Sequence, residues 1–96
     1  MTHDEALQEL EKLQGWSLRD GTVIEKEYPT RNFVETMALA NRIAAIAEEQ
    51  DHHPDLHLYY RNVHVVLSTH ALKGLTENDF IVAAKIDEPA ADGQQT

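Results

Sequence analysis

Three segments of the chain repeat apolar residues at helical spacing. They are residues 3–13, residues 31–49 and the stretch after Thr76. Capping boxes precede the first and third segments, because a threonine N-cap is followed three residues later by an acidic residue in both Thr2 to Glu5 and Thr76 to Asp79. The pattern therefore predicts three helices.

The long helix over residues 31–49 carries more apolar surface than one sheet contact needs. Its main stripe is Phe33, Met37, Ala40, Ile43, Ala44 and Ala47. Leu39 and Ile46 widen the stripe to roughly half of the circumference, whereas a helix on one sheet needs an arc of only ~100°. The excess indicates either a subunit contact or a deeply buried helix.

Four shorter segments are rich in β-branched and aromatic residues, as strands are. They are residues 16–19, 22–28, 55–61 and 62–69. Asp20-Gly21 suits a tight turn between the first two, so the pattern predicts two hairpins. If Arg61 and Asn62 form the second turn, three apolar cross-strand pairs share one face. These pairs are Tyr60 with Val63, Leu58 with Val65, and Leu56 with Leu67.

The order helix, hairpin, helix, hairpin, helix predicts a two-layer α+β fold. Isolated hairpins are marginally stable, so we expect one four-stranded antiparallel sheet with the three helices on one face. A chain of 96 residues is the size of a single domain, and we assign residues 1–96 to one domain with a loose tail at 89–96.

Composition narrows the classes of function. The formal net charge is −9, which argues against direct binding to nucleic acid because that requires cationic side chains. No cysteine is present, so disulfides, thiolate metal sites and cysteine nucleophiles are excluded. Neither a basic leader nor a membrane-length apolar run is found, and we expect a cytoplasmic protein without membrane contact.

Five of the six histidines lie between residues 52 and 70. Extending the predicted hairpin outward places His53 opposite His70, although Pro54 ends the ladder, and a turn before Pro54 could bring His52 into the same pocket. Imidazoles give and accept protons near neutral pH, so the cluster favours general acid-base catalysis. Histidines in surface loops without a function, or a metal site completed by Asp79, remain alternatives, although no HExxH or comparable spacing is present.

Other residues have simpler interpretations. His57 and His64 alternate with the apolar positions of the hairpin and are expected to face solvent or an interface, and His3 lies in a capping turn. By local pattern alone, Asp79 caps its helix and Tyr60 belongs to the core stripe.

A group of residues in the second half of the chain resembles the signature of the pterin-4a-carbinolamine dehydratases. The matching residues are Glu48, His52-His53-Pro54, Tyr60, Ser68-Thr69-His70, Gly74-Leu75-Thr76 and Asp79. Gly15-Trp16 and the long helix are similar to the N-terminal half of the family more loosely. Leu56 departs from the pattern, since many members carry an aromatic residue there, so the packing of the pocket is expected to differ.

The resemblance implies a reaction that needs no cofactor. A 4a-hydroxytetrahydropterin, left after turnover of an aromatic amino acid hydroxylase, loses water to give quinonoid dihydropterin. Carried over to this sequence, His52 and His70 are the expected proton donors and acceptors, and His53 holds and polarises the pterin. Asp79 would favour the imidazolium form of its neighbours.

The same resemblance implies supporting residues and partners. Glu48, Tyr60, Ser68 and Thr69 are expected to bind substrate or support the site, with backbone groups along residues 68–70 positioning the ring. The partners implied are a small pterin and a second copy of the chain, as a homodimer or homotetramer. Two alternatives stay open: a protein-binding module, because animal relatives bind and stabilise a transcription factor dimer, and a dehydratase acting on another pterin, for instance near molybdenum-cofactor metabolism.

Overall fold

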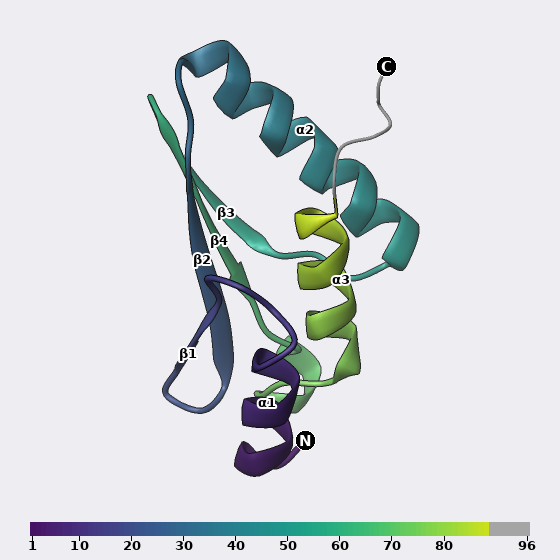
Figure 1. The fold of residues 1–96 in the computed structure, drawn as a ribbon. Helices are drawn as coiled ribbons and strands as arrows, with labels where there is room; N and C mark the ends of the chain where they lie inside the picture. The colour runs from purple at the N-terminus through teal and green to yellow at the C-terminus, as the bar shows by residue number, and fades with distance from the viewer. Residues whose placement is uncertain (89–96) are drawn as a thin grey trace.

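The computed structural model describes residues 1–88, and the predicted loose tail at 89–96 lies outside them. The helices are α1 (His3–Leu10), α2 (Phe33–Gln50) and α3 (Glu77–Asp87), with a short 3-10 helix η1 (His70–Leu72), and the strands are β1 (Ser17–Arg19), β2 (Val23–Pro29), β3 (Asp55–Tyr59) and β4 (Asn62–Leu67). This order confirms the predicted α+β class (Figure 1). The 3-10 helix was not predicted.

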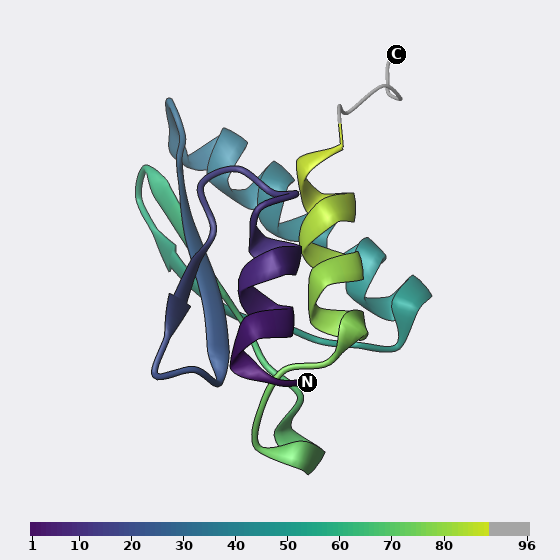
Figure 2. The same cartoon turned by 60° about the horizontal axis from the view of Figure 1, so that its bottom comes forward.

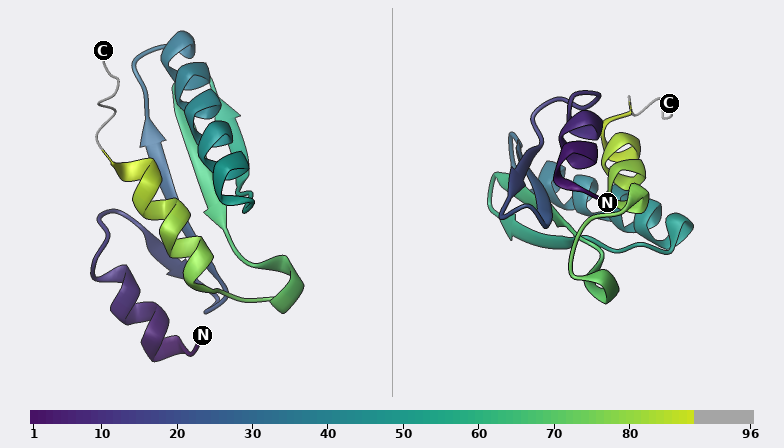
Figure 3. Two further views of the ribbon diagram at one scale, coloured as in Figure 1. Left: turned by 90° about the vertical axis from the view of Figure 1, so that its right-hand side faces the viewer. Right: turned by 90° about the horizontal axis from the view of Figure 1, so that it is seen from below.

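The four strands form one antiparallel sheet in the order β1-β2-β4-β3. All three α-helices lie on the same side of it, as Figure 2 shows with the sheet at the left and the helices at the right. Figure 3 shows α3 between α1 and α2. The layers are therefore those that the alternating and helical patterns predict.

The register of the second hairpin differs from the prediction. Leu56 pairs with Val65 and Leu58 with Val63, because the two-residue turn is Tyr60-Arg61 and not Arg61-Asn62. The start of α2 holds this turn, since the Thr36 hydroxyl donates to the Tyr60 carbonyl at 3.1 Å. The shift is two residues, an even number, so it leaves the apolar residues on the core face.

Tyr60 is the residue most affected by this shift. It lies in the turn with 69% of its surface exposed, so its predicted place in the core stripe is wrong. Its predicted partner Val63 is fully buried and instead faces Leu58.

The core fills the space between the sheet and the helices. Its fully buried aliphatic side chains are Ile24, Ile43, Val63, Val65, Leu67 and Val82. Burying each of them stabilises the fold by about 1.5–3 kcal/mol before the entropy cost. Leu39 and Ile46 pack against this core, whereas Phe33 and Met37, which were assigned to the core stripe of α2, are 50% and 36% exposed.

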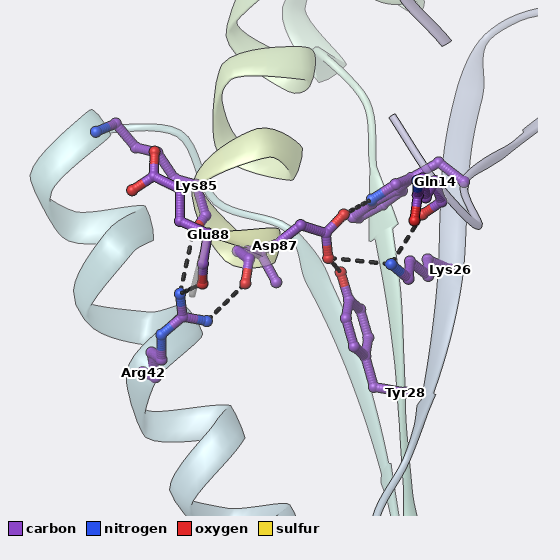
Figure 4. Close-up of polar contacts among 9 residues, drawn as sticks. Gln14, Lys26, Tyr28, Arg42, Lys85, Asp87 and Glu88 are labelled. Atoms are coloured by element: carbon purple, nitrogen blue, oxygen red, sulfur yellow. Dashed lines mark hydrogen bonds and ion pairs between the residues drawn. The ribbon is translucent and has the colours of Figure 1, made fainter. Parts of the chain in front are cut away.

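The C-terminal end of α3 is tied to both the sheet and α2 (Figure 4). The Asp87 carboxylate accepts from Tyr28 Oη at 2.6 Å, from Trp16 Nε1 at 2.7 Å and from Lys26 Nζ at 3.1 Å. Burial, followed by the hydrogen bond to Asp87, raises the pKa of Tyr28 above its usual range. Arg42 of α2 donates to the last carbonyls of α3, including that of Ile86 at 2.7 Å.

The face of the sheet away from the helices carries two histidines, His57 of β3 and His64 of β4. His57 and His64 are cross-strand partners whose rings stack with centroids 5.4 Å apart. His64 also bonds Glu25 at 2.8 Å, and this bond is the main reason why the pKa of Glu25 is lowered. His57 is exposed and His64 is partly buried, in agreement with the prediction that they lie outside the core.

Candidate active site

His52 lies directly after the C-terminal end of α2, where the backbone is well defined by hydrogen bonds. Asp51 adopts the left-handed conformation (φ 51°, ψ 43°). The N–H of His52 donates to the Ala47 carbonyl at 3.1 Å, and that of Asp51 donates to the Glu48 carbonyl at 3.4 Å. This pair of bonds is a Schellman motif, which ends the helix and fixes the direction of the chain at His52.

The side chain of His52 contacts a carboxylate in the interior. Its Nε2 lies 2.6 Å from Asp79 Oδ1, and the two side chains are 12% and 0% exposed. Asp79 Oδ2 accepts from the Thr69 hydroxyl at 2.8 Å and from the Thr76 N–H at 3.0 Å. The hydroxyls of Thr69 and Thr76 are themselves 2.8 Å apart. A buried charge requires such partners, and Asp79 has two hydrogen-bond donors besides its contact with His52.

These four residues come from three separate parts of the chain. His52 follows α2, Thr69 follows β4, and Thr76 and Asp79 belong to the predicted capping box at the start of α3, which is formed. Capping and contact with the histidine are therefore combined in Asp79. Because the ends of α2 and β4 pack against the start of α3, the capping box of α3 becomes part of a buried polar cluster with His52 and Thr69.

His70 lies on a short loop that is closed at its base. Thr69 and Gly74 form an isolated bridge, in which the Thr69 N–H donates to the Gly74 carbonyl at 2.7 Å. Between them His70 begins η1, and Lys73 ends it in the left-handed conformation. The loop projects from the body of the molecule (Figure 2), and the His70 side chain is exposed at its start.

His53 has a different partner from His52. Its Nε2 lies 2.6 Å from Glu48 Oε2 on the last turn of α2, and both side chains are largely exposed, at 55% and 78%. The shifted hairpin register also removes the argument that placed His53 opposite His70. His53 and Glu48 form a solvated pair beside the buried pair of His52 and Asp79.

Tyr60 and Ser68 differ in their distance from these histidines. Ser68 directly precedes Thr69 and is partly buried. Tyr60 lies beside Thr36 in the first turns of α2, whereas His52 lies beyond the other end of that 18-residue helix, which spans about 27 Å. Within one chain, the structure does not bring Tyr60 to the histidines.

The part that sequence reasoning missed is the hydroxyl of Thr76. The capping pattern indicated Thr76 as an N-cap, but a local pattern holds no information about the contact with Thr69, seven residues earlier across a loop. The sequence signal was that Thr69 and Thr76 bracket residues 70–75 and precede Asp79.

Within residues 1–88, no group of three or more His, Asp or Glu side chains is arranged to hold a metal ion. Over the same residues, no helix combines the length and apolar character needed to cross a bilayer.

Within residues 1–88, one hollow has no imidazole in its lining. It has a volume of about 580 Å³ and lies between α1 and the start of α3, lined by Met1, Glu5, Gln8, Glu9, Thr76, Glu77 and Asn78. Three carboxylates and no histidine line it, so its chemistry is acidic and differs from that of the histidine site.

Comparison with known proteins identifies the family. A sequence profile described as "Pterin 4 alpha carbinolamine dehydratase" matches residues 1–89. A protein of Nitrosospira multiformis, described as a "Putative pterin-4-alpha-carbinolamine dehydratase", is 44% identical over 91% of this chain and 76% of its own length. A longer Arabidopsis thaliana protein, "Pterin-4-alpha-carbinolamine dehydratase 2, mitochondrial", is 44% identical over 92% of this chain and 49% of its own length.

A solved structure agrees with this assignment. The "transcriptional coactivator/pterin dehydratase from Brucella Melitensis" superposes with a TM-score of 0.86 at 33% identity, covering 91% of this chain and 94% of that one. On the sequence match and the shared fold, this chain belongs to the pterin-4-alpha-carbinolamine dehydratase family.

Proposed function

We propose that this protein dehydrates a 4a-hydroxytetrahydropterin to quinonoid dihydropterin by histidine acid-base catalysis, and so recycles tetrahydropterin for aromatic amino acid hydroxylases. The observation that carries the proposal is the buried Asp79 carboxylate 2.6 Å from His52. Membership in the family supplies the substrate class.

The reaction needs one proton donor and one acceptor. The N5 lone pair of the pterin expels the C4a hydroxyl, which takes a proton and leaves as water, while a base removes the excess proton from the pterin. We assign these two tasks to His52 and His70, and contact with the pterin to His53. No redox step is involved, so the proposed reaction requires no cofactor.

The remaining residues of the resemblance are assigned supporting roles. Glu48 orients His53 at 2.6 Å, and Ser68 lies next to the Thr69-His70 peptide that would face the ring. A role for Tyr60 in binding the pterin stays a prediction, and would require the pterin to extend along the sheet or a second chain to supply this residue.

The decisive experiment is a dehydration assay with purified protein. We expect the wild-type protein to accelerate loss of the 4a-hydroxyl, and His52→Ala and His70→Ala each to lower kcat at least about tenfold, since a positioned acid or base contributes ~10²–10⁴-fold. His57→Ala is the matched control because His57 is an exposed histidine on the opposite face of the sheet.

Two results would contradict the proposal. A wild-type rate equal to the uncatalysed rate would exclude the dehydratase function. Full activity in both histidine variants would keep the function and exclude these residues as its acid and base.

A second candidate function is binding to a regulatory protein. It is favoured by the description of the Brucella relative as a transcriptional coactivator as well as a pterin dehydratase. A partner that binds the His52→Ala and His70→Ala variants as tightly as the wild type would support this function. A dehydratase acting on another pterin, such as one near molybdenum-cofactor metabolism, would show a preference for that pterin in the same assay.

We also propose that the protein is a homo-oligomer, either a dimer or a tetramer. Phe33, Val34 and Met37, at the start of α2, are 50%, 80% and 36% exposed and form an apolar patch on the outer side of that helix. Direct binding of nucleic acid is not expected at a net charge of −9. Location in the cytoplasm stays a prediction, and the Arabidopsis relative is described as mitochondrial.

A further inference from the structure

We propose that Thr69 and Thr76 are positioning residues that set the tautomer of His52. The Thr69 hydroxyl, itself bonded by the Thr76 hydroxyl, donates to Asp79, so that Asp79 accepts from His52, and His52 carries a proton on Nε2 and acts on the pterin through Nδ1. The kinetic part of this inference rests on the proposed function, and the tautomer itself does not.

The direction of each hydrogen bond follows from counting protons. Thr69 has a single hydroxyl proton, and its Oγ1 donates to Asp79 Oδ2 at 2.8 Å. The contact of 2.8 Å between the Thr69 and Thr76 hydroxyls must then use the proton of Thr76. The order of donation runs from Thr76 to Thr69 to Asp79.

The donors around Asp79 show which of its oxygens faces the threonines. Asp79 Oδ2 already accepts two protons, since the Thr76 N–H also donates to it at 3.0 Å. Its other oxygen, Oδ1, lies 2.6 Å from His52 Nε2. Donors on Oδ2 stabilise the ionised form of Asp79, and an ionised carboxylate has no proton on Oδ1, so Oδ1 accepts and Nε2 of His52 donates.

One tautomer then serves both directions of proton transfer. With Nε2–H committed to Asp79, the neutral ring presents the Nδ1 lone pair as a base, and the imidazolium presents Nδ1–H as an acid. The wrong tautomer would turn a proton toward the substrate where a base is needed. Geometry at Asp79 therefore selects the nitrogen that can react.

Thr69 occupies a special place in this network because it reaches both candidate acid-base residues. Its hydroxyl acts on His52 through Asp79, and its backbone closes the 69–74 loop that begins with His70. Its hydroxyl proton and one lone pair are already used within the protein. Thr69 thus has no hydroxyl proton left to donate to the pterin and acts through its neighbours.

The test is nitrogen NMR of the protein labelled with ¹⁵N-histidine, with the His52 signals assigned from the His52→Gln variant. The wild-type protein should show His52 with Nε2 protonated and Nδ1 bare at a pH where the ring is neutral. Thr69→Ser keeps the hydroxyl and should give the same pattern. Thr69→Val removes it at nearly equal volume and should give a measurable fraction of the Nδ1–H tautomer.

Kinetics supply the second readout. We expect Thr69→Val to lower kcat about tenfold, as loss of an orienting partner typically does, with KM within about twofold and with an altered pH profile, while Thr69→Ser restores kcat. Thr76→Val should act in the same direction, which provides a second variant if Thr69→Val does not fold.

The outcomes separate this inference from the proposed function. A wild-type His52 protonated on Nδ1, or a tautomer unchanged in both valine variants, would overturn it. If the wild-type protein has the Nε2–H tautomer and lacks dehydratase activity, the proposed function fails while the positioning role stands.

Discussion

At the scale of single residues, two carboxylates on α3, those of Asp79 and Asp87, are stabilised by hydrogen-bond donors from other parts of the chain. Asp79, in the first turn, also benefits from the positive end of the helix dipole. Asp87, the last residue of α3, is at the unfavourable end of the helix dipole. Three donors offset this, two from β2 and one from Trp16, which directly precedes β1. The partners of Asp87 are therefore more important for stability than those of an ordinary surface carboxylate.

This difference predicts a specific loss of stability. Asp87→Ala leaves Trp16 Nε1 and Tyr28 Oη without their acceptor and should lower the free energy of unfolding by about 1–3 kcal/mol in urea titration. The neighbouring Glu88→Ala is the control, because Glu88 provides only its backbone carbonyl to Arg42. It should change stability by less than about 0.5 kcal/mol. Equal effects of the two substitutions would show that Asp87 has no special role.

At the scale of elements, the ends of the helices determine where the site residues lie. Asn32 caps α2, and its side chain accepts from the N–H of Glu35 at 2.8 Å. The other end of α2 is closed at Asp51, a residue with φ of 51°, where glycine is the usual choice. An L-residue in this conformation costs about 1–2 kcal/mol, so the turn before His52 is strained.

Relief of this strain can be measured. Asp51→Gly should raise the free energy of unfolding by about 0.5–1 kcal/mol, since glycine adopts the left-handed conformation freely but loses more chain entropy on folding. Asp51→Ala keeps the strain and should give no gain. Thermal unfolding followed by circular dichroism compares the three proteins, and a higher Tm for the alanine variant than for the glycine variant would contradict this account.

At the scale of the whole molecule, the start of α2 exposes a group of apolar side chains to solvent in the single chain. Leu39 and Ile46, whose positions first indicated a wide apolar arc, pack on the core. The large apolar residues that α2 exposes are instead Phe33, Val34 and Met37. In α2 the residues packed on the core and the residues of the proposed subunit contact therefore lie at different positions.

This patch predicts how the oligomer would respond to added charge. Val34→Glu should lower the average mass in sedimentation equilibrium, because a charge inside an apolar contact is costly. Gln8→Glu on α1 adds the same charge at another exposed position and should leave the mass unchanged. A wild-type protein that is a monomer at all concentrations would exclude the oligomer, and equal masses for the wild type and Val34→Glu would exclude this patch as the contact.

The sequence by itself determined the class of fold, the order of elements and the capping residues. Periodicity and caps are local properties, so Thr76 and Asp79 marked the start of α3. The predicted end of the first helix was wrong, since α1 stops at Leu10 and not at residue 13. The predicted hairpin register was wrong because Tyr60-Arg61 and Arg61-Asn62 are both acceptable turns, and tertiary contacts of the turn with Thr30 and Thr36 favour the first.

For the candidate site too, some properties followed from the sequence and others only from the tertiary structure. The residue types of His52, His53 and His70 indicated proton transfer, because that property belongs to the side chain itself. Which carboxylate each histidine contacts was decided by the tertiary structure, which pairs His52 with buried Asp79 and His53 with exposed Glu48. Burial and donor geometry arise only when separate elements pack together, and no local pattern contains them.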